Sequence, residues 1–145
     1  MSFFNRLFGK KSFAHSVGER GAPLIAALQH QVRGVSFEVF CKNEIAIGYV
    51  HGCAQTLAKE AGAKDGAEIV KTVLVIFQEL FDEKRGVVLW AISNKMVPLA
   101  KEERTNWTLG FEGGGADTHR FLETWEEKNY AVFPPNLYQT LQYNA

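Results

Sequence analysis

Apolar positions recur most regularly between residues 43 and 83, where their spacing predicts two helices. In the second part of this stretch, apolar residues recur at steps of three and four, which places them on one face of a helix. These positions are Ile69, Val70, Val73, Leu74, Ile76, Phe77, Leu80 and Phe81. The first part carries Ile45, Tyr49, Cys53, Leu57 and Ala61 at steps of four. We therefore expect a central antiparallel helical hairpin over residues 43–83.

Capping signals mark the ends of both helices. Asn43 is a suitable N-cap for the first helix, and Gly62 can adopt the left-handed conformation that commonly follows a helix C-terminus. Asp65 and Glu68 have the spacing of a capping box, in which the Asp side chain accepts from the amide three residues on and the Glu reaches back. The capping signals and the apolar period therefore predict the same bounds for the hairpin.

Two glycines, Gly48 and Gly52, lie one turn apart on the first hairpin helix. Small residues at this spacing let a second helix approach closely. The same helix carries Glu44, His51 and Lys59, which a membrane helix would avoid. We expect a soluble helix with a close helix crossing at the two glycines.

The residues before the hairpin predict one further helix and one ambiguous segment. Gly18 and Gly21 interrupt the chain before Pro23, so a helix is expected to begin near Pro23 and to end at Gly34. Residues 35–42 alternate with the period of a strand, but their apolar positions also fit a helix face. Both alternatives stay open, with helix favoured because a lone strand needs partners.

Residues 87–92 are ambiguous in the same way, because a dense run of β-branched and aromatic residues also suits a buried strand. In the helical alternative, the packed side would comprise Val88, Ala91, Ile92, Lys95 and Met96. That helix is expected to end before Pro98. The neighbouring predicted helices favour it over the strand.

The C-terminal third is less regular in its pattern. Residues 106–111 alternate as a short strand would, and glycines follow at positions 113–115. Asp117 is a suitable N-cap for a helix with an aromatic apolar face. The fold class that follows is mainly α, a compact helical domain over residues 12–145 with one or two short strands in its last third.

Length and charge narrow the function classes. A chain of 145 residues with 46% hydrophobic and 22% charged residues is in the range of one globular domain. Lysine plus arginine number 16, as do aspartate plus glutamate, so the formal net charge is zero and no overall field attracts DNA or RNA. We expect no nucleic-acid partner.

Cysteine content and the absence of long apolar runs suggest where the protein works. Cys41 and Cys53 are too few for a disulfide framework in a domain of this length, and they lack C-x-x-C metal spacing. The sequence also lacks a signal-peptide core and the run of about 18 apolar residues that a membrane-spanning helix requires. We expect reduced thiols and a cytoplasmic location, with peripheral attachment to a membrane as an option.

Residues 1–11, which we call the N-terminal segment, combine aromatic and basic side chains. Phe3, Phe4, Leu7 and Phe8 share one helix face. Arg6, Lys10 and Lys11 lie elsewhere or just beyond that face. An apolar face flanked by cations suits the interface of an anionic membrane. The alternatives are docking on its own domain or on a neighbouring subunit, and a disordered tail.

Residues 110–120 are the strongest candidate for a ligand or catalytic site, because glycine-rich turns that open a helix bind phosphate or carboxylate groups. The candidate ligand residues are Glu112, Asp117, His119 and Arg120. The stretch lacks the Lys and Ser or Thr of a P-loop, and Glu112 and Asp117 would repel an anion. A flexible loop capped by Asp117 is the simpler interpretation.

Other combinations of reactive side chains fall short of a site. His119 and Glu123 have the spacing of two metal ligands on one helix face, but a zinc site needs at least three. His51 and Cys53 are about 200° apart round a helix, so they cannot form a nucleophile and base pair. The adjacent glutamates at 102–103 and 126–127 are solvated faces. We expect no catalytic residue, no metal site and no cofactor.

These patterns favour a non-enzymatic cytoplasmic interaction or adaptor protein that docks on a protein partner or an anionic membrane surface through its N-terminal segment. The alternative is a small-ligand-binding or enzymatic domain that uses residues 110–120. A third option is a homodimer that forms through part of the apolar stripe of residues 69–81.

Overall fold

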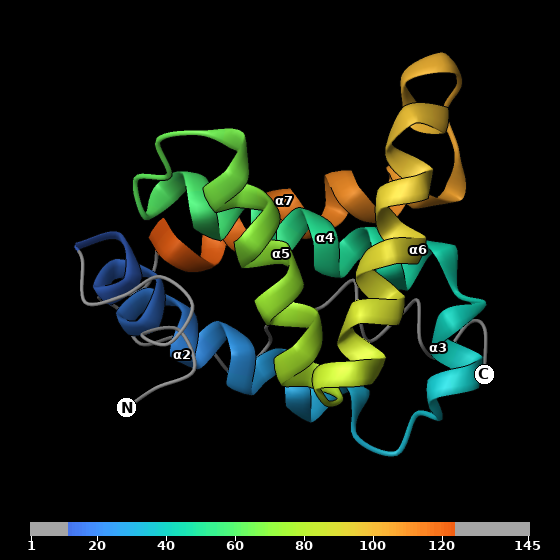
Figure 1. Cartoon of the computed structure of the whole chain (residues 1–145), viewed down its shortest axis with the longest axis horizontal. Helices are drawn as coiled ribbons and strands as arrows, with labels where there is room; N and C mark the ends of the chain where they lie inside the picture. The colour runs from blue at the N-terminus through green and yellow to red at the C-terminus, as the bar shows by residue number, and fades with distance from the viewer. Residues whose placement is uncertain (1–11, 124–145) are drawn as a thin grey trace.

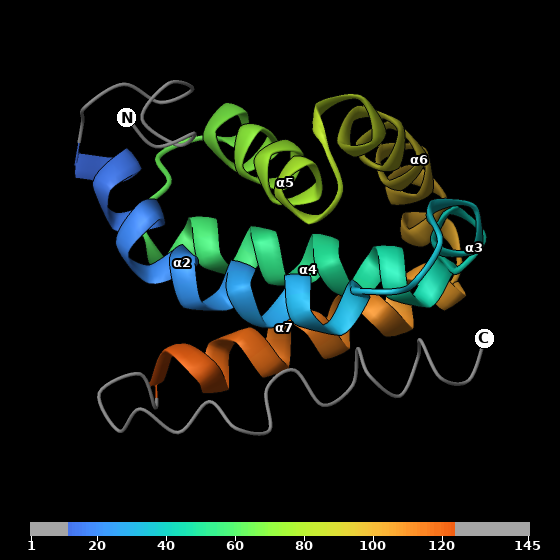
Figure 2. The ribbon, with the colours of Figure 1, turned by 90° about the horizontal axis from the view of Figure 1, so that it is seen from below.

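The computed structural model describes residues 12–123, and of residues 12–16 and 18–20 it describes the backbone alone. Every regular element in this part of the chain is a helix, which confirms the mainly α expectation. The helices are α2 (Ser12–Val32), α3 (Phe37–Cys41), α4 (Glu44–Glu60), α5 (Gly66–Leu80), α6 (Glu83–Glu102) and α7 (Asn106–Glu123). Figure 2 shows α4 in the middle, with α7 on one side of it and α5 and α6 on the other.

Helix α4 is buried on nearly all sides along its length. Its charged residues are confined to its ends, while its middle consists of apolar, small and uncharged polar residues. Ile47, Tyr49, Val50 and Leu57 are at most 1% exposed. A helix that is apolar all round is stable only when other helices cover it, which is why α4 occupies the centre.

The two expected N-caps are confirmed. The Asn43 side chain accepts a hydrogen bond of 3.0 Å from the amide of Ala46 at the start of α4. The Asp65 side chain accepts one of 3.0 Å from the amide of Glu68 at the start of α5. The Glu68 carboxylate reaches back as expected, but it accepts from the amide of Lys64, one residue before the cap.

The expected C-terminus of α4 is also confirmed, since Gly62 has a φ of 94°. Its amide donates to the carbonyl of Lys59, and the amide of Ala63 donates to the carbonyl of Ala58. These two bonds form a Schellman motif, which satisfies carbonyls that the helix end leaves free.

The hairpin itself is not confirmed as the centre of the fold. Helices α4 and α5 follow one another and touch, but α5 runs across α4, whereas α7 lies along α4 over its length (Figures 1 and 2). The α4–α7 pair makes the most extensive helix contact among the described residues. The expected stripe on α5 is largely directed into the core, where Val73, Ile76 and Phe77 are buried.

Both ambiguous segments are helical. Residues 37–41 form α3, which begins where the Ser36 hydroxyl accepts from the amide of Val39. Residues 87–92 lie inside α6. The preference for helix over strand in these two segments is therefore confirmed.

The expected helix boundaries at two prolines are wrong. Helix α2 begins at Ser12 and contains Pro23, and α6 contains Pro98 and continues to Glu102. A proline inside a helix costs about 3 kcal/mol through its missing amide and its clash with the preceding turn. In α2 the buried Val17 and Leu24 lie on either side of Pro23, so packing of the flanking turns offsets this cost.

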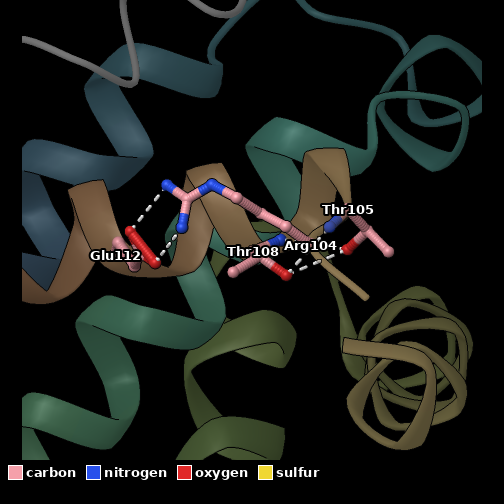
Figure 3. Close-up of polar contacts among 4 residues, drawn as sticks. All are labelled: Arg104, Thr105, Thr108 and Glu112. Atoms are coloured by element: carbon pink, nitrogen blue, oxygen red, sulfur yellow. Dashed lines mark hydrogen bonds and ion pairs between the residues drawn. The ribbon is translucent and has the colours of Figure 1, made fainter. Parts of the chain in front are cut away.

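The predictions for residues 106–117 are also wrong, because the whole stretch belongs to α7 and includes neither a strand nor a glycine loop. The helix begins after Thr105, and its cap is reciprocal: each of Thr105 and Thr108 donates its amide to the other's hydroxyl at 3.2 Å (Figure 3). This is the geometry of a capping box with threonine in place of glutamate. Asp117 consequently lies inside the helix and does not cap it.

The expected packed side of α6 is wrong in part. Its buried residues are Gly86, Leu89 and Ser93. Val88 is 45% exposed and Ala91 is exposed, although both were expected to pack. The small residues Gly86 and Ser93 determine which side of α6 is packed, because they let neighbouring helices come close. The positions of the apolar residues alone do not reveal this side.

Candidate functional site

The middle of the molecule is a close contact between the backbones of α4 and α7. A Cβ atom added at Gly48 would overlap the carbonyl of Trp107, and one added at Gly52 would overlap the carbonyl of Phe111. Only glycine fits at these two positions. The expectation of a close crossing at this glycine pair is therefore confirmed.

Helix α7 contributes a matching pair of glycines. A Cβ at Gly110 would overlap the carbonyl of Ile45, and one at Gly114 would overlap the carbonyl of Tyr49. The two helices thus interlock through four glycines, two from each. The signal in the sequence is the equal spacing of the two pairs, and it was not recognised because residues 106–111 fit a short strand and residues 110–120 a glycine-rich turn.

A buried polar group links α4, α6 and α7 beside this contact. The indole N–H of Trp107 donates to Ser93 Oγ at 2.9 Å, and His51 Nδ1 lies 2.6 Å from the same oxygen. The His51 ring packs edge-on against Trp107, with 5.2 Å between ring centroids. No spacing in the sequence connects these three positions, so the cluster could not have been found from the sequence.

A serine beside a histidine is also the pairing of a nucleophile and a base. Here Ser93 is 0% exposed and His51 is 6% exposed. Burial lowers the pKa of His51 to about 4, so the ring is neutral near pH 7. A substrate cannot reach the Ser93 hydroxyl in this structure, and the group acts as a hydrogen-bonded link between three helices.

A second buried link joins Tyr49 of α4 to Asp117 of α7. The Tyr49 hydroxyl donates to Asp117 Oδ2 at 2.6 Å, and Asp117 is 8% exposed. This short bond to a carboxylate is of the strong, charge-assisted kind. Asp117 therefore holds α7 against α4, and its carboxylate faces the interior of the fold.

Neither described cysteine has the features of a reactive thiol. Cys53 is fully buried, its sulfur donates to the carbonyl of Gly114 at 3.5 Å, and burial raises its pKa to about 12. Cys41 is half-buried, and burial followed by the charge of Glu38 raises its pKa as well. Both thiols stay protonated near neutral pH, and the protonated form is a poor nucleophile.

Of the four candidate ligand residues of the glycine-rich stretch, three are exposed and one is buried. Glu112 is exposed and forms a two-bond ion pair with Arg104, at 2.7 and 2.9 Å, which lowers the pKa of the glutamate (Figure 3). His119 is exposed and lies between Glu123, at 3.0 Å, and Glu60, at 3.4 Å. Arg120 is exposed as well, whereas Asp117 is turned inward. The glycine-rich turn that was expected to bind an anion is part of helix α7, so that interpretation is wrong.

The interaction residues expected in the N-terminal segment lie outside the described residues. They are Phe3, Phe4, Arg6, Leu7, Phe8, Lys10 and Lys11. The segment directly precedes α2, whose Leu24 and Leu28 are fully buried. Gln29 of the same helix donates to the carbonyl of Glu79 at 2.8 Å. The described part of the chain thus begins with a helix that packs on α4 and α5.

Two features are missing from the part of the chain that the structure describes. Between residues 12 and 123, no three His, Cys, Asp or Glu side chains are arranged to hold a metal ion. No described helix combines the length and the apolar character needed to span a bilayer. The largest accessible apolar side chains in this part of the chain include Val88 and Leu99 of α6, at 45% and 54% exposure.

Comparison with protein-family models, curated proteins and solved structures finds no match for this chain. Function is therefore inferred from the chain's own residues. In the middle of the described fold, the hydrogen-bonded groups of His51, Ser93 and Trp107 and of Tyr49 and Asp117 link neighbouring helices.

Proposed function

We propose that this chain is a non-enzymatic cytoplasmic interaction protein, which docks on a protein partner or an anionic membrane surface through its N-terminal segment. Phe3, Phe4, Leu7 and Phe8 serve as apolar anchors. Arg6, Lys10 and Lys11 add electrostatic attraction. The proposal makes residues 1–11 the site of contact and the helical body the part that is held there.

The observation that supports the proposal most is how α2 is anchored. Helix α2 (Ser12–Val32) follows the N-terminal segment in the sequence and is fixed by Val17, Leu24 and Leu28, each 0% exposed. Because the buried Val17 comes only a few residues after Lys11, docking of the segment would keep the body near the surface that it binds. A long flexible linker would leave the body free to move.

A second observation supports the non-enzymatic character. Cys53, His51 and Ser93 are buried, and each is engaged by a group of another helix. Such contacts stabilise the packing of α4, α6 and α7. These side chains therefore contribute to the stability of the fold through their hydrogen bonds.

Flotation with liposomes tests the proposal. The full chain is expected to float with vesicles that contain anionic lipid, less so at high salt, and a chain that begins at Ser12 should stay at the bottom. The double variant Phe4→Ser, Phe8→Ser should lose flotation and keep its melting temperature. A matched control is Val39→Ser, Leu109→Ser, which removes two exposed apolar side chains elsewhere, at 44% and 48% exposure.

The outcomes separate three situations. Salt-sensitive flotation that only the N-terminal changes remove identifies a membrane surface. If the full chain does not float but captures a purified partner that the shortened chain cannot, the target is a protein. A lower melting temperature for the Phe4→Ser, Phe8→Ser variant would mean that the segment belongs to the core, and the proposal would be wrong.

A further inference from the structure

Helix α6 has one side fixed on its neighbours. Gly86 lies so close to α5 that an added Cβ would overlap Gln78. Leu89 and Ser93 are both 0% exposed, and Ser93 bonds to α4 and α7 through His51 and Trp107. The orientation of α6 about its own axis is therefore set by these contacts, and its opposite side faces outward.

The outward side carries a row of residues that we call the α6 stripe. It consists of Val88, Ala91, Ile92, Lys95 and Leu99. Their spacing of three, four, seven and eleven residues from the first puts them on one helix face. Val88 is 45% and Leu99 is 54% exposed, and Ile92 is half-buried at the margin. Figure 1 shows α6 at the edge of the molecule, its C-terminal end projecting beyond the other described helices.

Charges of opposite sign lie at the two ends of this stripe. Lys84 precedes Val88 and Glu102 follows Leu99, and about five turns separate them, so both project from the same side of α6 as the stripe. Glu83 and Lys101, whose charges are reversed, lie about 100° away round the helix. Lys84 thus gives the stripe a positive start and Glu102 a negative end, and the part between them is apolar except for Lys95.

We propose that the α6 stripe pairs with the α6 stripe of a second copy of this chain, antiparallel and about a two-fold axis near Ser93 and Asn94. In this register Val88 lies opposite Leu99 of the other copy, and Lys84 lies opposite its Glu102. The symmetry makes each contact occur twice. The interface lies outside the N-terminal segment, and it does not depend on the proposed docking function.

Charge complementarity favours a second copy over other occupants. An anionic membrane would attract Lys84 and Lys95 but repel Glu102, and it would not account for the opposite charges at the two ends. The helix dipole by itself favours anions at a helix start and cations at its end, which is the reverse of what the stripe carries. An antiparallel copy puts each of these charges opposite one of the other sign.

The size of the contact sets the expected strength. A pair of helices with short side chains is expected to bury less than about 1,200 Å², which is the range of weak and transient interfaces. Lys95 lies in the middle of the stripe, where its stem can cover Ile92 of the other copy while its ammonium group reaches solvent. We therefore expect a dimer whose population depends on concentration.

Sedimentation velocity of the full chain, over a wide range of protein concentration, tests the pairing. The mass is expected to rise toward that of two chains. Leu99→Glu, at a position that solvent already reaches, is expected to raise the dimer dissociation constant by roughly a hundredfold, because two buried leucines become charged. The control is Leu109→Glu on α7, an exposed leucine outside the stripe, which should leave dimerisation unchanged.

Charge exchange tests the antiparallel register. Lys84→Glu and Glu102→Lys should each weaken the dimer, and the double variant should restore it, because each copy then again presents opposite charges. Both single changes agree with the helix dipole, so neither should destabilise the monomer. Recovery in the double variant supports the antiparallel arrangement, and its failure contradicts it.

Three further results would overturn the proposal. The chain could stay monomeric at all concentrations, or a dimer could form that Leu99→Glu does not affect. The third is flotation of the chain that begins at Ser12, abolished by Leu99→Glu, which would make the stripe a lipid-binding face. None of these results bears on docking through residues 1–11, which the Phe4→Ser, Phe8→Ser variant tests separately.

Discussion

At the scale of single residues, burial has its clearest effect on the pKa of His51. Its ring is enclosed by Trp107 and Phe111 and bonded to Ser93, all of them uncharged. A proton on the ring would therefore be enclosed without a nearby negative partner among these contacts. This is the physical cause of the lowered pKa, about 4 instead of 6.5.

The lowered pKa predicts a loss of stability in acid. Because the unfolded histidine binds a proton near pH 6.5 and the folded one only near pH 4, the contribution of His51 is complete above pH 6.5 and is lost as the pH falls between these values. The full loss is about 3 kcal/mol. Urea unfolding of the wild type and of His51→Gln at pH 7 and pH 4.5 should show a smaller pH dependence in the variant.

The control for this prediction is His30→Gln, which replaces an exposed histidine. It should keep the pH dependence of the wild type. Equal pH dependence in the wild type and in His51→Gln would show that His51 is protonated in the folded protein without penalty, and would contradict the assignment.

At the scale of helices, the four interlocking glycines predict a sharp contrast between positions. Gly48→Ala places a Cβ against the backbone carbonyl of Trp107, where no side chain can move aside. We expect a loss of about 2 kcal/mol or more in the free energy of unfolding. Gly66→Ala is the matched control, since nothing lies within 4 Å of its Cβ at the start of α5.

The control should be neutral or stabilising by about 0.5–1 kcal/mol, because alanine is the better helix former. Urea unfolding of both variants measures the contrast. If the two substitutions had similar effects, α4 and α7 would not be in backbone contact, and the central helix pair would need to be revised.

How far the fold could be predicted depends on how local each signal is. The caps at Asn43 and Asp65 and the turn at Gly62 were predictable because their partners lie within a few residues. The helical state of residues 110–115 was not, because glycine normally disfavours a helix interior. The cost is offset by contact with α4, about sixty positions earlier in the chain, and local reasoning cannot include such a partner.

The same limit applies to the site residues. Asp117 has the composition of an N-cap, and only its hydrogen bond to Tyr49 shows that it faces the core. On α6, the apolar residues Val88 and Ala91 were expected to pack, but the small residues Gly86 and Ser93 determine the packed side. The exposed stripe is thus visible only once the helix is placed on its neighbours.

At the scale of the whole molecule, the two proposed contact surfaces belong to different parts of the sequence, residues 1–11 and helix α6. The described start of α2, which follows the N-terminal segment in the sequence, lies at one end of the long axis in Figure 1, and α6 lies toward the other end. A dimer through α6 would carry two N-terminal segments. Once one segment has bound a vesicle, the second segment of the dimer is held close to the same surface, so its effective concentration there is high. The dimer would therefore bind the vesicle more tightly than a single chain does.

This arrangement predicts how the two surfaces combine. Leu99→Glu should weaken flotation of the full chain with anionic vesicles by about tenfold or more, without abolishing it, because a single segment still binds. Phe4→Ser, Phe8→Ser should abolish flotation but leave the concentration dependence of the mass unchanged. Flotation across a range of lipid concentrations, together with sedimentation of each variant, measures both. If Leu99→Glu dissociates the dimer and flotation is unchanged, the two segments do not reach one surface together, and docking and pairing are separate properties of the chain.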